Sequence, residues 1–172
     1  MGLRGHHNST NLPVETASFL IVRLGNNYMA LPAEGVRGVL TQEEAGTQQT
    51  VTSAGIIYHP VDLAERLSVV AHLSGVEFRT VLYSTGHSHS AIGVEQVVGL
   101  TDVERQDCLP LPIQFQGDER NWFQGMMLYE NELVLILNPL WVLGELADHA
   151  SLFGGQADKM VITTPAATGG SC

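Results

Sequence analysis

The apolar residues of this chain occur in short runs separated by residues suited to tight turns, and this pattern constrains the fold more than any other feature. The run at residues 19–24 is followed by Gly25-Asn26-Asn27 and by a return run at residues 28–31. Glycine and asparagine tolerate positive φ, and two apolar runs joined by such residues are typical of a β-hairpin. The chain is therefore predicted to consist of strands rather than long helices.

Two further hairpins are predicted from the same pattern. One joins residues 80–84 to residues 91–94 through the turn Gly86-His87-Ser88-His89. The other joins residues 126–129 to residues 133–137 through Glu130-Asn131-Glu132. Short strands separated by turn residues at this spacing favour an all-β architecture.

Only two short helices are predicted. Residues 61–67 carry apolar residues and an early Asp62, and residues 139–147 begin with Asn138 as N-cap and Pro139 at the first helical position. In the second helix one face is expected to pack against the strands. That face would comprise Leu140, Leu143, Gly144 and Ala147.

An internal repeat becomes visible when the sequence is shifted by 61 residues. The segment at residues 30–39 then falls on residues 91–100, with Ala, Glu, Val and Gly at coinciding positions. The run that begins at Phe19 falls on the run that begins at Thr80. A hairpin followed by a Val-x-Gly-[VL] segment therefore occurs twice, which favours a duplicated β unit.

Length, charge and cysteine content exclude several classes of protein. The chain of 172 residues is 44% hydrophobic, enough for one substantial core, and its two cysteines, Cys108 and Cys172, do not form a disulfide framework. Its formal charge of −10 opposes binding to nucleic acid. No apolar run is long enough to cross a membrane. We expect a cytoplasmic protein without membrane insertion, with flexible tails at residues 1–17 and 148–172.

The sequence offers only weak candidates for catalysis or metal binding. His87 and His89 could share a zinc ion if both side chains lay on one face of a strand, but their place at a hairpin tip favours a solvated turn. The adjacent His6 and His7 lack a fixed third ligand. We therefore expect no metal and no cofactor.

Possible catalytic groups have simpler explanations. Cys108 has no evident base in the sequence, and Asp62 and Glu65 are better explained as charges near a helix start. The glycines form no phosphate-binding pattern. We expect that the protein is not an enzyme and that it acts by binding.

The order of these segments resembles that of CheW-like domains. Residues 19–40 resemble the opening of the family, Pro60-Val61-Asp62-Leu63 resembles its Pro-Val-x-Asp-Leu signature, and residues 91–100 are similar to its Gly-hydrophobic-x-[DE]-x-Val-x-x-Val stretch. Residues 123–140 resemble its closing hairpin and short helix. The resemblance covers residues 18–147 and implies two packed SH3-like five-stranded β-barrels with a short C-terminal helix. It further implies a non-catalytic adaptor that couples a CheA-type histidine kinase to methyl-accepting chemoreceptors.

The chain departs from the family pattern where the family contacts its partners. The usual Asn-x-Arg-Gly segment is missing, because Gly55-Ile56-Ile57-Tyr58-His59 leads directly into Pro60, and Gly38 replaces a common Glu. We therefore expect an altered partner set, such as a chemotaxis-like pathway for surface motility. The expected partner-binding residues lie in two segments: Val36, Arg37, Val39 and Leu40, and Ile56, Ile57, Tyr58 and His59.

A second hypothesis is a β-barrel that senses a small ligand or a metal. Its site would be His87 and His89, or a cleft between the barrels. Val36, Val39 and Ile56 could also be plain barrel core, in which case their substitution would unfold the domain.

Overall fold

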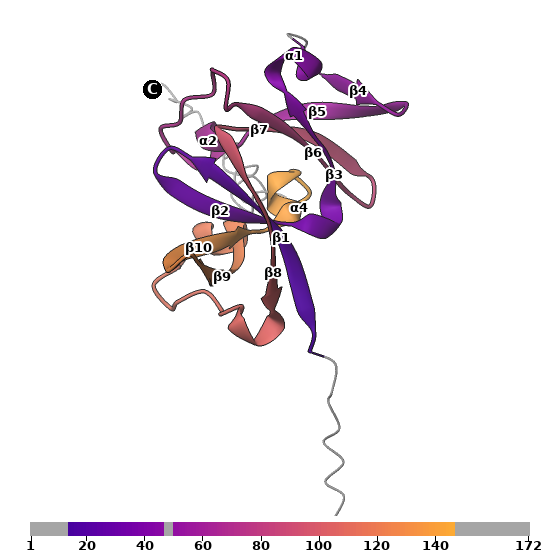
Figure 1. Cartoon of the computed structure of the whole chain (residues 1–172). Helices are drawn as coiled ribbons and strands as arrows, with labels where there is room; N and C mark the ends of the chain where they lie inside the picture. Colours follow the sequence, from indigo (N-terminus) through magenta and orange to yellow (C-terminus); the bar gives the residue numbers. More distant parts are fainter. Residues whose placement is uncertain (1–13, 47–49, 147–172) are drawn as a thin grey trace, which may run out of the picture.

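The computed structural model describes residues 14–46 and 50–146 and has two curled five-stranded sheets (Figure 1). We call the sheet with strand order β8-β1-β2-β10-β9 the first barrel, and the sheet with order β3-β6-β7-β5-β4 the second barrel. The expected all-β fold of two SH3-like barrels is confirmed.

The strands are β1 (Thr16–Leu24), β2 (Asn27–Pro32), β3 (Val36–Thr41), β4 (Val51–Ser53), β5 (Ile56–Asp62), β6 (Arg79–Thr85), β7 (Ser88–Val94), β8 (Gln96–Glu104), β9 (Phe123–Tyr129) and β10 (Glu132–Leu137). The helical segments are α1 (Gln42–Ala45), α2 (Leu63–Arg66), α3 (Glu119–Trp122) and α4 (Pro139–Val142), with 3₁₀ turns at Ala33–Gly35 and Arg105–Asp107. β1 begins at Thr16, slightly before the predicted start of the domain at residue 18.

All three predicted hairpins form, and their turns show why. The β1–β2 turn uses Gly25 at φ 59°, and the β9–β10 turn uses Glu130 at φ 49° and Asn131 at φ 68°. Positive φ at turn positions matches the right-handed twist of the paired strands. The β6–β7 turn is shorter than predicted, because Ser88 pairs with Thr85 and His89 already belongs to β7.

The predicted repeat is visible as an exchange of strands between the barrels. β3 leaves the β1–β2 hairpin and pairs with β6 in the second barrel, while β8 leaves the β6–β7 hairpin and pairs with β1 in the first. The register is the same in both: Val39 lies opposite Val81, and the equivalent Leu100 lies opposite Leu20. Both pairings also contain a register shift at the equivalent place. The two halves are thus duplicated β units, and each supplies one strand to the barrel of the other.

The duplication extends beyond the part that is visible in the sequence. After the exchanged strand, each half adds a hairpin and a one-turn helix: β4, β5 and α2 in one half, β9, β10 and α4 in the other. The last strand of each hairpin runs parallel to the second strand of the barrel. A shift of 76 residues relates these parts, so that Ile57 corresponds to Leu133.

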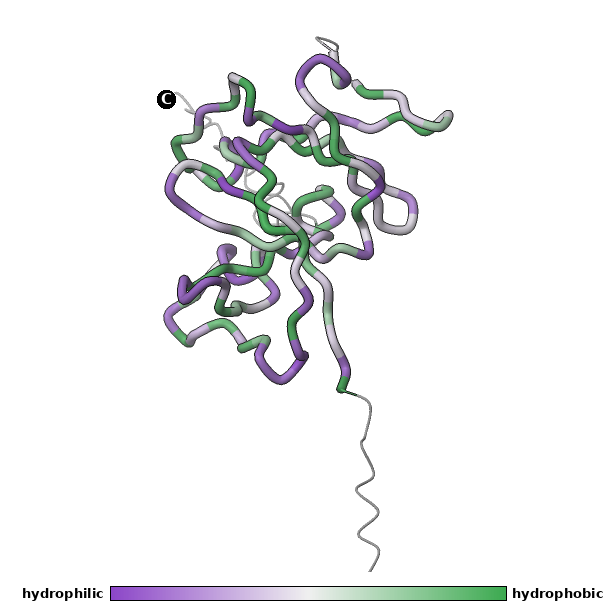
Figure 2. Tube along the Cα trace, in the orientation of Figure 1, coloured by the Kyte–Doolittle hydropathy of each residue, from purple (hydrophilic) through white to green (hydrophobic). Residues whose placement is uncertain are grey.

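The core consists of one large cluster between the barrels and a smaller cluster inside each of them. The large cluster contains Leu20 and Leu31 from the first barrel and Val81 and Ile92 from the second, all at most 3% exposed. Figure 2 shows hydrophobic colouring along the strands where the barrels meet and hydrophilic colouring at several turns. Because the barrels share this apolar surface, they are expected to unfold together.

Both predicted helices are shorter than expected. Val61 and Asp62 belong to β5, and α2 begins at Leu63. α4 begins after the predicted cap, since the Oδ1 of Asn138 accepts a hydrogen bond from the N–H of Leu140 at 3.2 Å, but it ends at Val142.

The predicted apolar face of α4 is confirmed only in part, because a single turn does not sustain a helical stripe. Leu143, just after the turn, packs against the large core cluster, but Gly144 is exposed. The buried residues of α4 are Pro139, Trp141 and Val142, whereas Leu140 is 43% exposed. Trp141 stacks on Trp122 with ring centroids 5.3 Å apart, which fixes the orientation of the turn. Ala147 lies outside the described residues.

Candidate partner-binding surface

Side chains alternate between the inside and the outside of the second barrel along β3. Val36 packs against the large core cluster, and Leu40 packs against the cluster inside the second barrel. Arg37 is exposed, and Val39 is 38% exposed. Of the four predicted positions on β3, Arg37 and Val39 are therefore the ones available to a partner.

The tip of the β4–β5 hairpin exposes both of its faces. Ile56 is 36% exposed, Ile57 is 54% exposed, and His59 is exposed as well. Tyr58 is only 3% exposed and packs with Leu82 and Ala91 inside the second barrel. The prediction of Tyr58 as a contact residue is wrong, because the two-residue period of the strand turns it inward between exposed neighbours.

The two predicted segments do not form one continuous strand pair. β6 and β7 lie between β3 and β5 in the sheet. Their inward side chains meet, since Leu40 and Tyr58 belong to the same interior cluster, but their outward side chains lie on separate strands. A partner that used both segments would have to span the outside of the second barrel.

Sequence reasoning missed the exposed apolar residues of the first barrel. Leu100 is 70% exposed, and the cross-strand neighbours Leu128 and Leu133 are 65% and 58% exposed. Leu100 corresponds to Val39 in the 61-residue repeat, so the repeat itself carried the signal. Leu133 corresponds to Ile57 only through the 76-residue relation, which the sequence does not reveal.

The two histidines of the β6–β7 hairpin have different environments. His87 is exposed in the turn, whereas the Nδ1 of His89 lies 2.8 Å from the hydroxyl of Ser84 and its ring packs edge-on against Tyr58 at 5.7 Å. Residues 14–46 and 50–146 contain no group of three or more metal-ligating side chains. His89 thus has a packing role, and His6 and His7 lie outside the described residues.

Among the other possible catalytic groups, Asp62 caps a helix and the Cys108 thiol is not activated. The carboxylate of Asp62 caps α2 by accepting a hydrogen bond from the N–H of Glu65 at 2.9 Å, as expected for an acid at a helix start. Burial raises the pKa of the Cys108 thiol, and Asp107 adds to this effect. Because the thiolate is the reactive form, Cys108 is not activated as a nucleophile.

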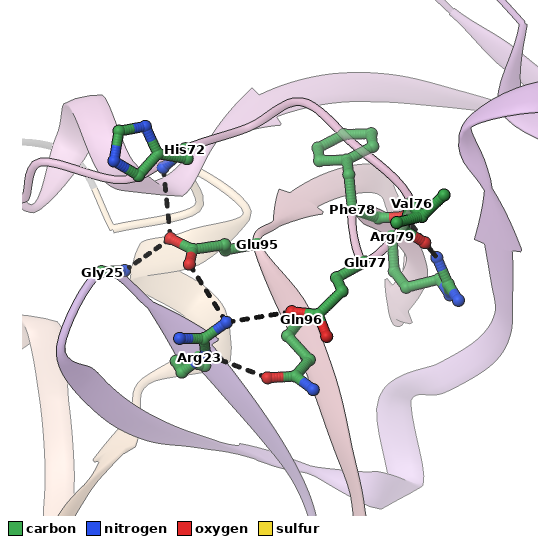
Figure 3. A network of polar contacts seen from close by, with 9 residues as sticks. All are labelled: Arg23, Gly25, His72, Val76, Glu77, Phe78, Arg79, Glu95 and Gln96. Carbon is green, nitrogen blue, oxygen red and sulfur yellow. Dashed lines mark hydrogen bonds and ion pairs between the residues drawn. The ribbon is translucent and has the colours of Figure 1, made fainter.

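A polar network around Glu95 fixes the junction between the two repeats (Figure 3). Its carboxylate accepts hydrogen bonds from the N–H groups of Gly25 at 3.0 Å and His72 at 3.1 Å, and it lies 3.2 Å from the guanidinium of Arg23. Arg23 also contacts Gln96 and Glu77. The backbone donors of His72 and Gly25, helped by Arg23, lower the pKa of Glu95. One carboxylate thus holds together the β1–β2 turn, the loop before β6 and the start of β8.

A buried tyrosine on β6 of the second barrel links it to β2 of the first barrel. The hydroxyl of Tyr83 donates a hydrogen bond to the carbonyl of Pro32 at 2.9 Å. A Cβ atom on Gly35 would lie 2.3 Å from the Tyr83 ring, so only glycine fits there. Burial raises the pKa of Tyr83, and Glu34 adds to this shift. Tyr83 is therefore a neutral structural residue.

Fold and surface together define a class of protein. It is a duplicated β scaffold that exposes apolar side chains on its strands, and its polar residues Asp62, Glu95 and Tyr83 make hydrogen bonds that stabilise the fold. The chain belongs to the family of CheW-like domains, since the model of that family matches residues 18–146. CheW proteins are non-catalytic scaffolds of chemotaxis signalling, so the expectation that this chain is not an enzyme is confirmed.

A solved structure supports the fold. The scaffolding protein TtCheW from Thermoanaerobacter tengcongensis aligns with a TM-score of 0.63 and 12% sequence identity, over 72% of this chain and 90% of that chain. No curated protein matches the chain. Among the described residues, no helix has the length and apolar character needed to span a membrane.

Proposed function

We propose that this protein is a cytoplasmic coupling adaptor that connects a CheA-type histidine kinase to chemoreceptors, or to a related output such as surface motility. The observation that carries this proposal is the exposure of apolar side chains on the outside of the second barrel. Ile57 is 54% exposed at the hairpin tip and Val39 is 38% exposed on β3. Exposed aliphatic side chains on a rigid strand are suited to bind a partner, because burying them removes apolar surface from water.

The proposed contact residues are those that point outward: Arg37, Val39, Ile56, Ile57 and His59. Val36 and Leu40 contribute by holding β3 in place. The missing Arg-Gly segment supports a partner set that differs from that of standard receptor coupling. Without its arginine, the β5 contact relies on the burial of apolar side chains.

The internal repeat supplies a matched test. The purified chain is titrated with the regulatory domain of the CheA-type kinase and with the receptor signalling tip from the same genome. Ile57→Asp is expected to weaken binding of at least one partner by about tenfold or more, as at a central apolar contact. Leu133→Asp is the control, because Leu133 has the equivalent place on the first barrel and is 58% exposed. Equal binding by both variants would refute the proposed surface, and failure of both partners to bind the unchanged chain would refute the function.

A further inference from the structure

The first barrel has an open cavity at the end where β1 begins. The cavity has a volume of about 750 Å³, and its lining includes Ala17, Phe19, Pro32 and Ile136. The repeat places the equivalent residues of the second barrel around a space of only about 260 Å³. Pockets of several hundred Å³ in the mouth of a β-barrel are common ligand sites.

One substitution between the repeats helps to explain the difference. Ala17 of the first barrel corresponds to Phe78 of the second in the 61-residue shift. A Cβ atom on Gly93 would lie 3.4 Å from the Phe78 ring, so this ring lies against the wall of the smaller space. Leu73, from the loop before β6, also lines it. The second barrel thus carries its own apolar plug, whereas the methyl group of Ala17 leaves the first barrel open.

The cavity lies beside a strand edge that has no partner among the described residues. β2 ends at Pro32, which lies opposite Phe19, so residues 16–18 of β1 continue past it and pair only with β8. The N–H of Arg105 donates to the carbonyl of Glu15 at 2.9 Å. Antiparallel alternation therefore turns the backbone N–H groups of Thr16 and Ser18 away from β8, toward the open side. An extended segment could pair with them.

The charges around this mouth select the kind of segment. Glu34 lines the cavity, Glu15 directly precedes β1 at the mouth, and both side chains are exposed. The one basic residue of the lining, Arg105, is 3.5 Å from the carboxylate of Glu15. The excess of negative charge favours basic residues in the bound segment.

We propose that the mouth of the first barrel binds an extended, basic segment of a partner protein, which adds to the edge of β1 and inserts a large apolar side chain beside Ala17. The inserted side chain would lie in the cavity of the first barrel. The equivalent space in the second barrel is restricted by Phe78 and Leu73. This contact is separate from the surface of β3 and β5 described under the proposed function. The full chain would then hold two partners, one on each barrel.

The test uses a blocked hexapeptide, Lys-Val-Lys-Phe-Lys-Val, whose apolar and basic side chains alternate along an extended chain. The acidic peptide Glu-Val-Glu-Phe-Glu-Val is the matched control. Affinity for the full-length protein is measured by calorimetry, and exchange of the Thr16 and Ser18 amide hydrogens is followed by NMR. The basic peptide should bind at least about tenfold more tightly than the acidic one and should slow exchange at both amides.

Two variants locate the contact. Ala17→Phe supplies the missing plug, and Ser18→Pro removes an edge N–H without removing a donor to β8; each should weaken peptide binding by about tenfold or more. Thermal unfolding shows whether each variant is folded, and Ile57→Asp should leave peptide binding unchanged.

Other outcomes would overturn the proposal. Equal affinity for both peptides, or full affinity in both folded Ala17→Phe and Ser18→Pro variants, would refute it. Slow exchange at Thr16 and Ser18 in the free protein would show that residues 1–13 or a second copy already cover this edge. Dependence of that protection on protein concentration would identify the second copy.

Discussion

The hydrogen bond from Tyr83 to Pro32 gives the most direct test of how the barrels are joined. Tyr83 is fully buried on β6 of the second barrel, and Pro32 ends β2 of the first. Tyr83→Phe keeps the ring and removes the hydroxyl, which leaves the carbonyl of Pro32 without that donor. Loss of one partner of a buried hydrogen bond costs about 1–3 kcal/mol. With a urea m-value of about 1–3 kcal/mol/M, the unfolding midpoint should fall by about 1 M.

Urea unfolding followed by tryptophan fluorescence measures this cost. The matched control is Tyr58→Phe, because the Tyr58 ring is also buried but its hydroxyl makes no hydrogen bond within the described residues. The control should change the free energy of unfolding by less than about 0.5 kcal/mol. Equal midpoints for Tyr83→Phe and the unchanged protein would refute the role assigned to this bond.

The same tyrosine predicts a pH dependence. Burial raises the pKa of Tyr83 above its ordinary value of about 10. A raised folded-state pKa means that this contribution to stability is complete below the unfolded pKa and is lost as pH rises toward the folded pKa. The free energy of unfolding should therefore fall above about pH 10 in the unchanged protein and fall less in Tyr83→Phe. Parallel alkaline profiles would contradict this assignment.

Three further predictions concern the contacts that hold the repeats together. Gly35→Ala should destabilise the protein by about 1–3 kcal/mol or more in urea, because its Cβ would overlap the Tyr83 ring; an unchanged midpoint would show that the ring can move. Arg66→Ala should lower the free energy of unfolding by about 1–2 kcal/mol and change the tryptophan emission, since the guanidinium lies 4.9 Å from the Trp141 ring centroid. Arg66→Lys should restore only part of this stability. In Glu95→Gln, the free energy of unfolding should fall less at acid pH than in the unchanged protein. The lowered pKa of Glu95 means that its contribution is present above the ordinary value of 4.5 and is lost as pH falls through the folded pKa, so identical acid profiles would count against the network.

Local chemistry made the hairpins and the helix start predictable from sequence. Gly25 and Asn131 adopt the positive φ that their turns require, and Asn138 caps α4 as expected. The repeat was also visible, because equivalent positions of β2 and β3 and of β7 and β8 keep similar residues. These signals depend on residues that are close in sequence or equivalent in the repeat.

The rest depended on contacts between distant segments. No local pattern indicates that β3 and β8 exchange barrels, since the exchange depends on pairing with strands that are distant in the sequence. β3 pairs with β6, and β8 pairs with β1. The apolar run Ile56-Ile57-Tyr58 has no alternation from which an inward face can be read. For the same reason the sequence did not distinguish buried Tyr58 from its exposed neighbours.

The cavity of the first barrel illustrates the same limit. The shift of 61 residues aligns Ala17 with Phe78, but only the folded barrels show that these two residues line the mouths of the two barrels. The role of Glu95 was equally hidden, because its partners Gly25 and His72 are far from it in the sequence.

The central claim, that this protein joins two signalling partners, is tested most directly by co-sedimentation. Vesicles that carry the chemoreceptor are incubated with the CheA-type kinase, with and without the purified chain, and the kinase in the pellet is measured. We predict that the kinase sediments with the vesicles only when the chain is present, and less when the chain carries Ile57→Asp. Equal sedimentation with and without the chain would contradict the account.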